Sequence, residues 1–292
     1  MSGETARIAV VGGTGFIGAP TARRLAAAGH DVDVLHRARM TARFDPDVVI
    51  HFALMNEGDA EAALMTWPRA RLVAIGSGDV YRAYGQLLGL EPRDDSDGRA
   101  LLDEGAPLRA TLYPYGRRVD SPWGPLVDYD KILVERVVRA ADVPATILRL
   151  PKVYGAAARD RPFARWIDWM RAHDGRDAEL PVGVRQGRWR WTHGYVEDVA
   201  AAIALAATDA RAAGRTYNVG ERDTPTQRQR AADLARALGW PGRILDVDDA
   251  ALPPPLRDPH NGAPDLAVDT RRIRAELGFT EPTAYDDALR AA

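Results

Sequence analysis

The chain has 292 residues, of which 46% are hydrophobic, and its formal net charge is −2. This composition is typical of a globular protein with a substantial core, and the near-neutral charge gives no sign of a nucleic-acid or anionic-membrane surface. The absence of cysteine excludes disulfides, thiolate nucleophiles and cysteine-based zinc sites. No stretch resembles a secretion signal or a membrane span, so we expect cytoplasmic residence.

The first segment, "ARIAVVGG", predicts a buried strand, because it is a short β-branched run that ends in glycines. The following "TGFIGAPTARRLAAAGH" has helical spacing and stops at Gly29. Between them, Gly12, Gly15 and Gly18 form a G-x-x-G-x-x-G turn. Such a turn lets the backbone approach a pyrophosphate, while the helix N-terminus offers free N–H groups to the phosphates. The turn therefore predicts dinucleotide binding, with a merely structural turn as the alternative.

Three further strands are predicted from the apolar runs "DVDVLHR", "DVVIHFA" and "RLVAIGS". Their mostly apolar character is typical of strands that are buried on both faces of a parallel sheet. The fold class is therefore α/β, with a Rossmann-like doubly wound parallel sheet. At the end of the second strand, an NAD-specific site would place an acidic residue, but this chain has His36, Arg37 and Arg39. A guanidinium suits a 2′-phosphate, so we expect NADP as the cofactor, with NAD left open.

The second half begins with a helix predicted over residues 126–141 and a strand in "ATILRLPKVYG". After about residue 155 the pattern becomes irregular and rich in Trp, Pro and Gly, with helices at "VEDVAAAIALAATD" and "PTQRQRAADLARALG". We therefore divide the chain into a dinucleotide-binding core, residues 1–155, and a smaller C-terminal part, residues 156–292. The second part is expected to bind mainly substrate and to return some segments to the core.

Five motifs in order, "GGTGFIG", "GSGDVY", "LRLPKVYG", "YVEDVAAAI" and "YNVG", resemble those of extended short-chain dehydrogenases/reductases of the NAD-dependent epimerase/dehydratase group. The resemblance covers nearly the whole chain. It implies an oxidoreductase or epimerase-like enzyme that moves a hydride to or from a carbinol carbon of a small molecule. By position, Ser77 corresponds to the family's catalytic Ser/Thr, and Lys131 to the lysine that holds the nicotinamide ribose. Lys152 stands where many members have a substrate-binding asparagine. Lys131 and Lys152 are the only lysines of the chain.

The remaining site residues are expected partly from the glycine turn, the strand ends and the residue types, and partly from the resemblance. The expected cofactor-binding residues are Gly12, Thr14, Gly15, Phe16, Ile17, Gly18, His36, Arg37, Arg39, Ala53, Lys131, Pro151 and Val153. The expected substrate-binding residues are Ser77, Lys152, Arg190 and Trp191. We expect no metal site, because the histidines show no ligand spacing.

The first departure from the family pattern lies between His36 and Val48, where only eleven residues replace a helix, a third strand and another helix. A return path of roughly 20 Å is too long for an eleven-residue helix at ~1.5 Å per residue, but an extended segment at ~3.3 Å per residue can span it. The third strand is therefore expected to be missing.

The second departure is the catalytic tyrosine, whose position four residues before Lys131 is taken by Val127. Tyr129 lies two residues from Lys131, about 200° around a continuous helix, and would point elsewhere. If the helix begins only near residue 128, Tyr129 can turn inward, and we take it as the candidate acid. The alternatives are three other tyrosines: Tyr81, Tyr113 and Tyr115.

A different class of function stays open at this point, namely a catalytically silent NADP-binding sensor or nucleic-acid-associated scaffold. Loss of the tyrosine favours it, and survival of Ser77, Lys131 and Lys152 opposes it. For the enzyme we expect a small-molecule substrate, no membrane or nucleic-acid partner, and a monomer or homodimer.

Overall fold

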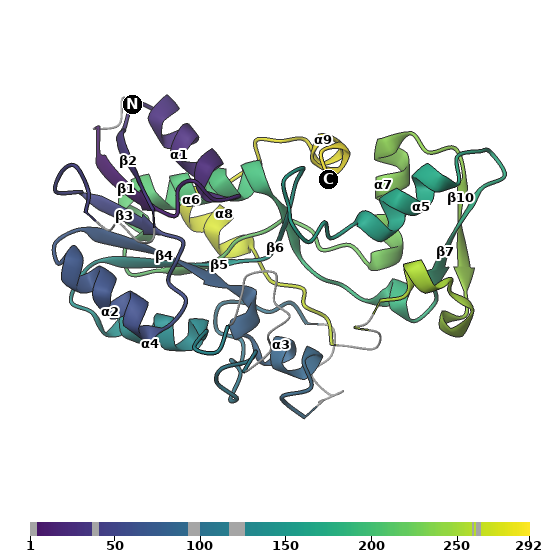
Figure 1. Ribbon diagram of the computed structural model, residues 1–292, viewed down its shortest axis with the longest axis horizontal. Coiled ribbons are helices and arrows are strands. Elements are labelled where there is room, and N and C mark those ends of the chain that lie inside the picture. The colour runs from purple at the N-terminus through teal and green to yellow at the C-terminus, as the bar shows by residue number, and fades with distance from the viewer. Residues whose placement is uncertain (1–4, 37–40, 93–99, 117–125, 259, 261–263) are drawn as a thin grey trace.

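The computed structural model describes residues 5–36, 41–92, 100–116, 126–258, 260 and 264–292. Its centre is a parallel sheet of six strands in the order β2-β1-β3-β4-β5-β9 (Figure 1). The strands are β1 (Arg7–Val11), β2 (Asp31–Leu35), β3 (Val48–His51), β4 (Arg71–Ser77), β5 (Ala145–Leu150) and β9 (Thr216–Asn218). The α/β class and the four N-terminal strands predicted from apolar runs are therefore confirmed.

Helices cover both faces of this sheet (Figure 1). One face carries α1 (Gly18–Ala27), α6 (Val196–Thr208) and α8 (Arg271–Leu277), and the other carries α2 (Glu57–Thr66) and α4 (Lys131–Ala140). Alternate residues of β1 belong to the two cores: Ile8 and Val10 pack with the first helix layer, and Ala9 and Val11 with the second. This double burial explains why the strands are almost continuously apolar.

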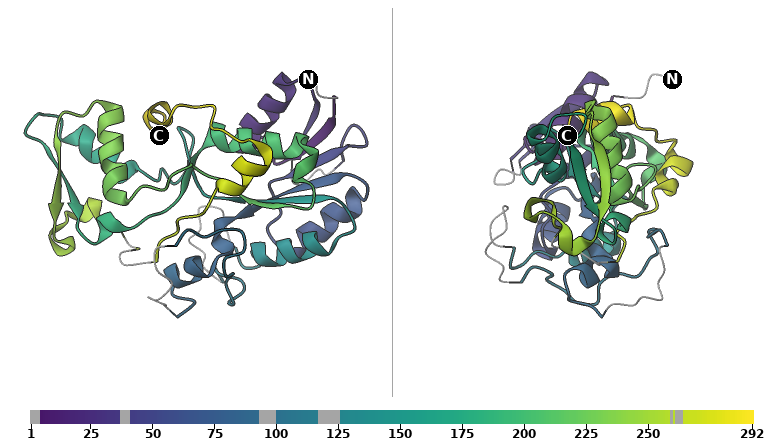
Figure 2. Two further views of the ribbon diagram at one scale, coloured as in Figure 1. Left: turned by 180° about the vertical axis from the view of Figure 1, so that it is seen from behind. Right: turned by 90° about the vertical axis from the view of Figure 1, so that its right-hand side faces the viewer.

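A second lobe lies beyond one end of the sheet (Figures 1 and 2). It consists of α5 (Ala164–Ala172), α7 (Gln227–Leu238) and the parallel pair β7 (Glu179–Gly183) and β10 (Arg243–Val247), with α9 (Tyr285–Arg290) packed on α7. Its core is separate and includes Trp166, Leu180 and Leu234. Between the lobes runs a short parallel ribbon of β6 (Lys152–Tyr154) and β8 (His193–Tyr195). A short helix, α3 (Arg82–Leu87), follows β4.

The helix expected over residues 126–141 begins later, at Lys131, so its predicted start is wrong. Asp130 adopts an extended backbone conformation and caps the helix, because its carboxylate accepts a hydrogen bond from the Ile132 N–H at 2.8 Å. Tyr129 consequently lies outside the helix. Its side-chain direction is therefore not set by the rotation of about 200° that a continuous helix would impose.

The connection from β2 to β3 crosses β1, since β1 pairs with both strands. Its described part, residues 41–47, contains bends and coil and no strand, and residues 37–40 lie outside the described residues. Within the described part of the chain, β2 is the last strand at this edge of the sheet. The missing third strand stays a prediction.

Among the described residues, no helix combines the length and the apolar character that a membrane crossing requires.

Candidate active site

The candidate catalytic residues meet at the carboxyl end of β4. Ser77 is the last residue of β4, and Lys131 opens α4 on the neighbouring face. The Lys131 ammonium donates hydrogen bonds to the backbone carbonyls of Leu54 and of Ile75, the latter at 3.0 Å. These two carbonyls fix the side chain between β3 and β4. Burial lowers the pKa of Lys131 to about 8.

Tyr129 turns inward to the same place. Its hydroxyl donates a hydrogen bond of 2.6 Å to Oδ2 of Asp79, and the Lys131 Nζ lies 5.7 Å from the centre of its ring. A hydrogen bond with Ser77 favours the phenolate, but burial and then the charge of Asp79 outweigh it and raise the pKa of Tyr129 well above its usual value. Tyr129 is therefore a neutral phenol at physiological pH.

Asp79 was missed by the sequence analysis, although it lies only two residues after Ser77. It is 4% exposed and occupies the 3₁₀ turn Gly78–Val80, where its N–H donates to Ser77 Oγ at 3.2 Å. Its Oδ2 accepts from Tyr129 and, at 3.2 Å, from the Tyr115 hydroxyl. Among the described residues, Oδ1 is buried and has no hydrogen-bond partner. Burial raises the pKa of the Asp79 carboxyl.

The three alternative tyrosines differ in whether their hydroxyl groups reach Asp79. Tyr115 belongs to the same cluster, since its hydroxyl contacts both Asp79 and, at 3.2 Å, Tyr84. Tyr81 is fully buried, and its hydroxyl donates to Asn218 at 2.6 Å in a network that supports the sheet end. Tyr113 is 45% exposed. Tyr129 and Tyr115 are thus the tyrosines that converge on Asp79.

The glycine turn has the geometry of a phosphate cradle. Gly12 has a φ of +82°, which side chains rarely adopt. A Cβ on Gly18 would lie 2.2 Å from the Gly12 carbonyl oxygen, so only glycine allows α1 to start here. The helix begins at Gly18, and its N-cap residue Ile17 offers no side-chain cap to the first N–H groups. These uncapped donors, at the point where the strand order reverses between β1 and β3, fit a dinucleotide pyrophosphate.

The remaining predicted cofactor residues lie around this turn and the nearby strand ends. Phe16 faces Gly155 after β6, with 3.5 Å between its ring and a Cβ built on that glycine. Ala53 follows β3, while Pro151 and Val153 flank the start of β6. Thr14 and His36 are exposed. Arg37 and Arg39 lie outside the described residues.

A cavity of about 130 Å³ opens beside Ser77, and most of the predicted substrate-binding residues line it. Its lining is Ser77, Gly78, Asp79, Tyr81, Tyr84, Leu102, Leu150, Pro151, Lys152, Trp191, Thr192, Leu266 and Val268. Arg190 is not part of this lining; it forms an ion pair with Asp265 at 2.8 Å.

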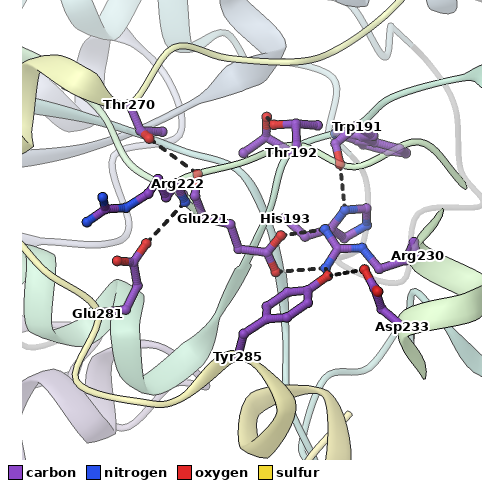
Figure 3. Close-up of polar contacts among 12 residues, drawn as sticks. Trp191, Thr192, His193, Glu221, Arg222, Arg230, Asp233, Thr270, Glu281 and Tyr285 are labelled. Carbon is purple, nitrogen blue, oxygen red and sulfur yellow. Dashed lines mark hydrogen bonds and ion pairs between the residues drawn. The ribbon is translucent and has the colours of Figure 1, made fainter. Parts of the chain in front are cut away.

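Trp191 is held in place by His193 of β8, in the ribbon between the lobes (Figure 3). Nδ1 of His193 lies 2.7 Å from the Trp191 carbonyl oxygen. Burial and then the nearby Arg230 charge lower the pKa of His193 far below its usual value, so the ring is neutral and Nδ1 donates this bond. His193 thus acts as a structural support of the cavity wall.

A larger cavity of about 470 Å³ lies on α7, α9 and the segment after β9, and none of the predicted site residues line it. Glu221, one of its lining residues, pairs with Arg230, whose guanidinium also donates to the Tyr285 hydroxyl at 2.9 Å (Figure 3). Glu281 pairs with Arg274 at 2.5 Å. This arrangement ties α9 to α7. Within the described residues, no group of three or more acidic or histidine side chains is placed to hold a metal.

The sheet, the glycine cradle and the cluster of Ser77, Tyr129 and Lys131 define an NAD(P)-dependent enzyme of the extended short-chain dehydrogenase/reductase type. The sequence profile of the NAD dependent epimerase/dehydratase family matches residues 8–67 and 111–220. The chain belongs to this family, as the resemblance implied.

Two characterised proteins are similar over most of the chain. dTDP-6-deoxy-L-talose 4-dehydrogenase (NAD(P)(+)) of Kitasatospora kifunensis is 29% identical, across 98% of this chain and 94% of that protein. 2′-dehydrokanamycin reductase of Streptomyces kanamyceticus is 30% identical, across 84% of this chain and 70% of that protein. Among solved structures, RMD from Pseudomonas aeruginosa complexed with NADPH has the same fold, with a TM-score of 0.67, 18% identity, and coverage of 98% of this chain and 97% of that one.

Proposed function

We propose that the protein is an NADP-dependent oxidoreductase that interconverts a carbonyl and a carbinol carbon of a small-molecule substrate, with Tyr129 as the proton donor. The observation that carries this proposal is the position of the Tyr129 hydroxyl, 2.6 Å from Asp79 and in the same cluster as Ser77 and Lys131. Because α4 begins only at Lys131, Tyr129 lies before the helix, and its side chain turns into this cluster. The missing tyrosine of the sequence pattern is therefore compensated from two residues away.

The residues divide the work as follows. When bound, the nicotinamide supplies or receives the hydride. Ser77 donates a hydrogen bond to the reacting oxygen, and Tyr129 transfers a proton to it. The raised pKa of Tyr129 keeps its proton in place at neutral pH, which is the state required for reduction of a carbonyl. Lys131 holds the ribose.

Asp79 replenishes that proton. A phenolate beside an ionised carboxylate would be strongly disfavoured, because two like charges would share a buried site. The raised pKa of the Asp79 carboxyl makes its protonated form accessible, and this form can return a proton to Tyr129 across their hydrogen bond. In the oxidative direction the two proton transfers, between Tyr129 and the substrate oxygen and between Asp79 and Tyr129, run in reverse. We therefore assign Asp79 as a positioning and proton-relay residue.

The activity is tested with substrates taken from the two relatives. NADPH consumption is measured with 2′-dehydrokanamycin and a panel of keto sugars, and NADP⁺ reduction with dTDP-6-deoxy-L-talose. We expect turnover with at least one of these compounds. Tight NADPH binding without hydride transfer to or from any of them would contradict the proposal.

We also propose that NADP(H) is preferred over NAD(H), which the presence of Arg37 after β2 supports. A charge-assisted hydrogen bond to the 2′-phosphate contributes ~1.5 to 3 kcal/mol, or roughly ten- to a hundredfold in affinity. Titration of both cofactors into the parent protein and into Arg37→Ala measures this preference. Equal affinities in the parent, or a preference that Arg37→Ala leaves unchanged, would refute it.

A further inference from the structure

The proton that Tyr129 gives to a substrate has to be replaced from water, although the groups around it are buried. Tyr129 is 9% exposed, and Asp79, which accepts its hydrogen bond, is 4% exposed. Lys131 is 5% exposed, and its ammonium already donates to the backbone carbonyls of Leu54 and Ile75. A replacement proton therefore has to cross a layer of protein before it reaches Tyr129.

Two tyrosine hydroxyls continue outward from Asp79. The Tyr115 hydroxyl lies 3.2 Å from Asp79 Oδ2 and 3.2 Å from the Tyr84 hydroxyl. Both tyrosines are half-buried, and Tyr84 lines the cavity beside Ser77. Each distance lies within the ~2.6 to 3.2 Å over which a proton passes directly between two groups. Together with the 2.6 Å contact of Tyr129, these hydrogen bonds form an unbroken chain from the buried phenol to a half-buried tyrosine of the cavity wall.

The hydrogen bonds of this chain point in the direction that delivers a proton inward. Tyr115 donates to Asp79 Oδ2, so its own oxygen is left to accept from the Tyr84 hydroxyl. When Asp79 has returned its proton to Tyr129, its Oδ2 takes the proton of Tyr115, Tyr115 takes that of Tyr84, and water restores Tyr84. Hydrogen bonds in a chain polarise one another, which favours a concerted shift. One proton enters from water in each turnover, and every hydroxyl regains its proton.

The position of Tyr115 in this chain is fixed by a buried arginine. Arg109 is 3% exposed, and its guanidinium donates to the backbone carbonyls of Asp79 and Thr111, each at 2.5 Å. Its third contact, at 3.3 Å, is with the carboxylate of Asp130, which caps α4. The segment that leads to Tyr115 is therefore bonded both to the turn after β4 and to the start of α4.

We propose that Tyr84 and Tyr115 form the path along which a proton from water reaches Asp79 and, through it, Tyr129. Tyr115 acts through Asp79 and is therefore a positioning residue of the proton relay, and Tyr84 connects it with the cavity. The inference rests on the proposed function for the role of Tyr129. It deepens that function because it names the source of the proton that each reduction consumes.

The first test follows the exchange of the Tyr129 hydroxyl with water and needs no substrate. The full-length protein, labelled with ¹³C in its tyrosine rings, is transferred into deuterated water, and the hydroxyl exchange is followed by the isotope shift on Cζ. The Tyr129 signal is the one that Tyr129→Phe removes. We expect Tyr115→Phe and Tyr84→Phe each to slow this exchange roughly tenfold, because each change breaks the path. Tyr113→Phe is the matched control and should leave the rate unchanged, since Tyr113 is 45% exposed and lies outside the chain of hydroxyls.

The sign of this change separates a relay from a structural role. The ring of Tyr115 packs against that of Tyr129, with 5.2 Å between their centres, and phenylalanine retains the ring. If Tyr115 only supported the packing of the cluster, its replacement would loosen the cluster and speed the exchange of the Tyr129 hydroxyl. Loss of a relay slows the exchange instead.

The second test compares the first turnover with later turnovers in the reduction of a keto substrate that the parent protein accepts. The first hydride transfer uses the proton that Tyr129 already carries, so Tyr115→Phe should leave its rate within about twofold of the parent rate. Each later turnover needs a new proton. The steady-state kcat of Tyr115→Phe should therefore fall roughly tenfold with KM unchanged, which is less than the ~10² to 10⁴ expected for loss of a direct general acid.

The inference would be overturned if the Tyr129 hydroxyl exchanged in Tyr115→Phe as fast as in the parent or faster, or if kcat stayed the same. Unchanged exchange in Tyr84→Phe would overturn the path through Tyr84. A parent protein in which Tyr115→Phe slows the exchange but no hydride is transferred would count against the proposed function alone. The two failures are therefore distinguishable.

Discussion

At the scale of single residues, the proposed proton relay depends on the protonation of Asp79, whose Oδ2 accepts the hydrogen bond of the Tyr129 hydroxyl. Its carboxyl has a raised pKa, so it is protonated at low pH and loses its proton as the pH rises through that value. Reduction of a carbonyl consumes one proton, which the protonated carboxyl can restore to Tyr129. The two groups therefore titrate as a coupled pair rather than independently.

We predict that reductive turnover falls as the pH rises through the Asp79 pKa, and that Asp79→Asn lowers the rate and removes this pH dependence. A pH profile of the rate with saturating NADPH measures both effects. Asp198→Asn is the control, because Asp198 also has a pKa raised by burial but lines the larger cavity away from Ser77. An unchanged pH profile in Asp79→Asn would show that Asp79 is only structural.

The sequence was informative for residues that occupy a family motif. Ser77 and Lys131 were identified by position, and both lie at the carboxyl end of β4 or beside it. Asp79 could not be identified in this way, because its importance comes from burial and from hydroxyl groups 36 and 50 residues away in sequence. Such long-range convergence leaves no local signal beyond an acidic residue in an apolar segment.

At the scale of elements, the start of α4 determines where Tyr129 lies relative to the other residues of the candidate active site. Two aspartates, Asp128 and Asp130, are equally good N-cap residues in the sequence, and periodicity cannot choose between them. Tertiary contacts make the choice: the Asp130 carboxylate is fully buried and also accepts from the Tyr113 N–H at 2.7 Å and from Arg109 at 3.3 Å. The buried strands, by contrast, were predictable because their apolar runs are bounded by turn residues.

Replacement of Asp130 tests this assignment. We predict that Asp130→Ala lowers the free energy of unfolding by about 3 to 5 kcal/mol, because it removes a cap and leaves the buried Arg109 without its carboxylate. Urea denaturation measures the change. Asp128→Ala is the matched control and should cost less than about 0.5 kcal/mol, since Asp128 is exposed. Equal effects of the two changes would mean that the cap is misassigned.

At the scale of the whole molecule, the cofactor cradle and the outer lobe are built from separate cores. The outer lobe was the least predictable part of the chain, because its short strands β7 and β10 carry no strong alternation and pair across more than 60 residues. A buried ion pair of Arg230 with Glu221 joins α7 to the segment after β9 (Figure 3). This pair links the outer lobe to the end of the main sheet.

We predict that Arg230→Ala lowers the free energy of unfolding by about 3 to 5 kcal/mol, since it leaves Glu221 without its partner in a largely buried position. NADPH affinity of the folded variant should be unchanged, because the glycine turn belongs to the other lobe. Arg228→Ala, which removes the exposed pair with Asp246, should cost about 0 to 1 kcal/mol. A loss of cofactor affinity in Arg230→Ala would indicate that the lobes are not energetically separate.

The central claim is that Tyr129 replaces the tyrosine that the family pattern lacks. Single-turnover hydride transfer from bound NADPH tests it most directly in the parent, Tyr129→Phe, Tyr115→Phe and Lys131→Ala proteins. We predict that Tyr129→Phe slows transfer by ~10² to 10⁴ without changing NADPH affinity, because one general acid is lost. Tyr115→Phe should have a much smaller effect, and Lys131→Ala should impair both transfer and cofactor binding. Transfer in Tyr129→Phe within about twofold of the parent rate would contradict the claim, because another group would then supply the proton.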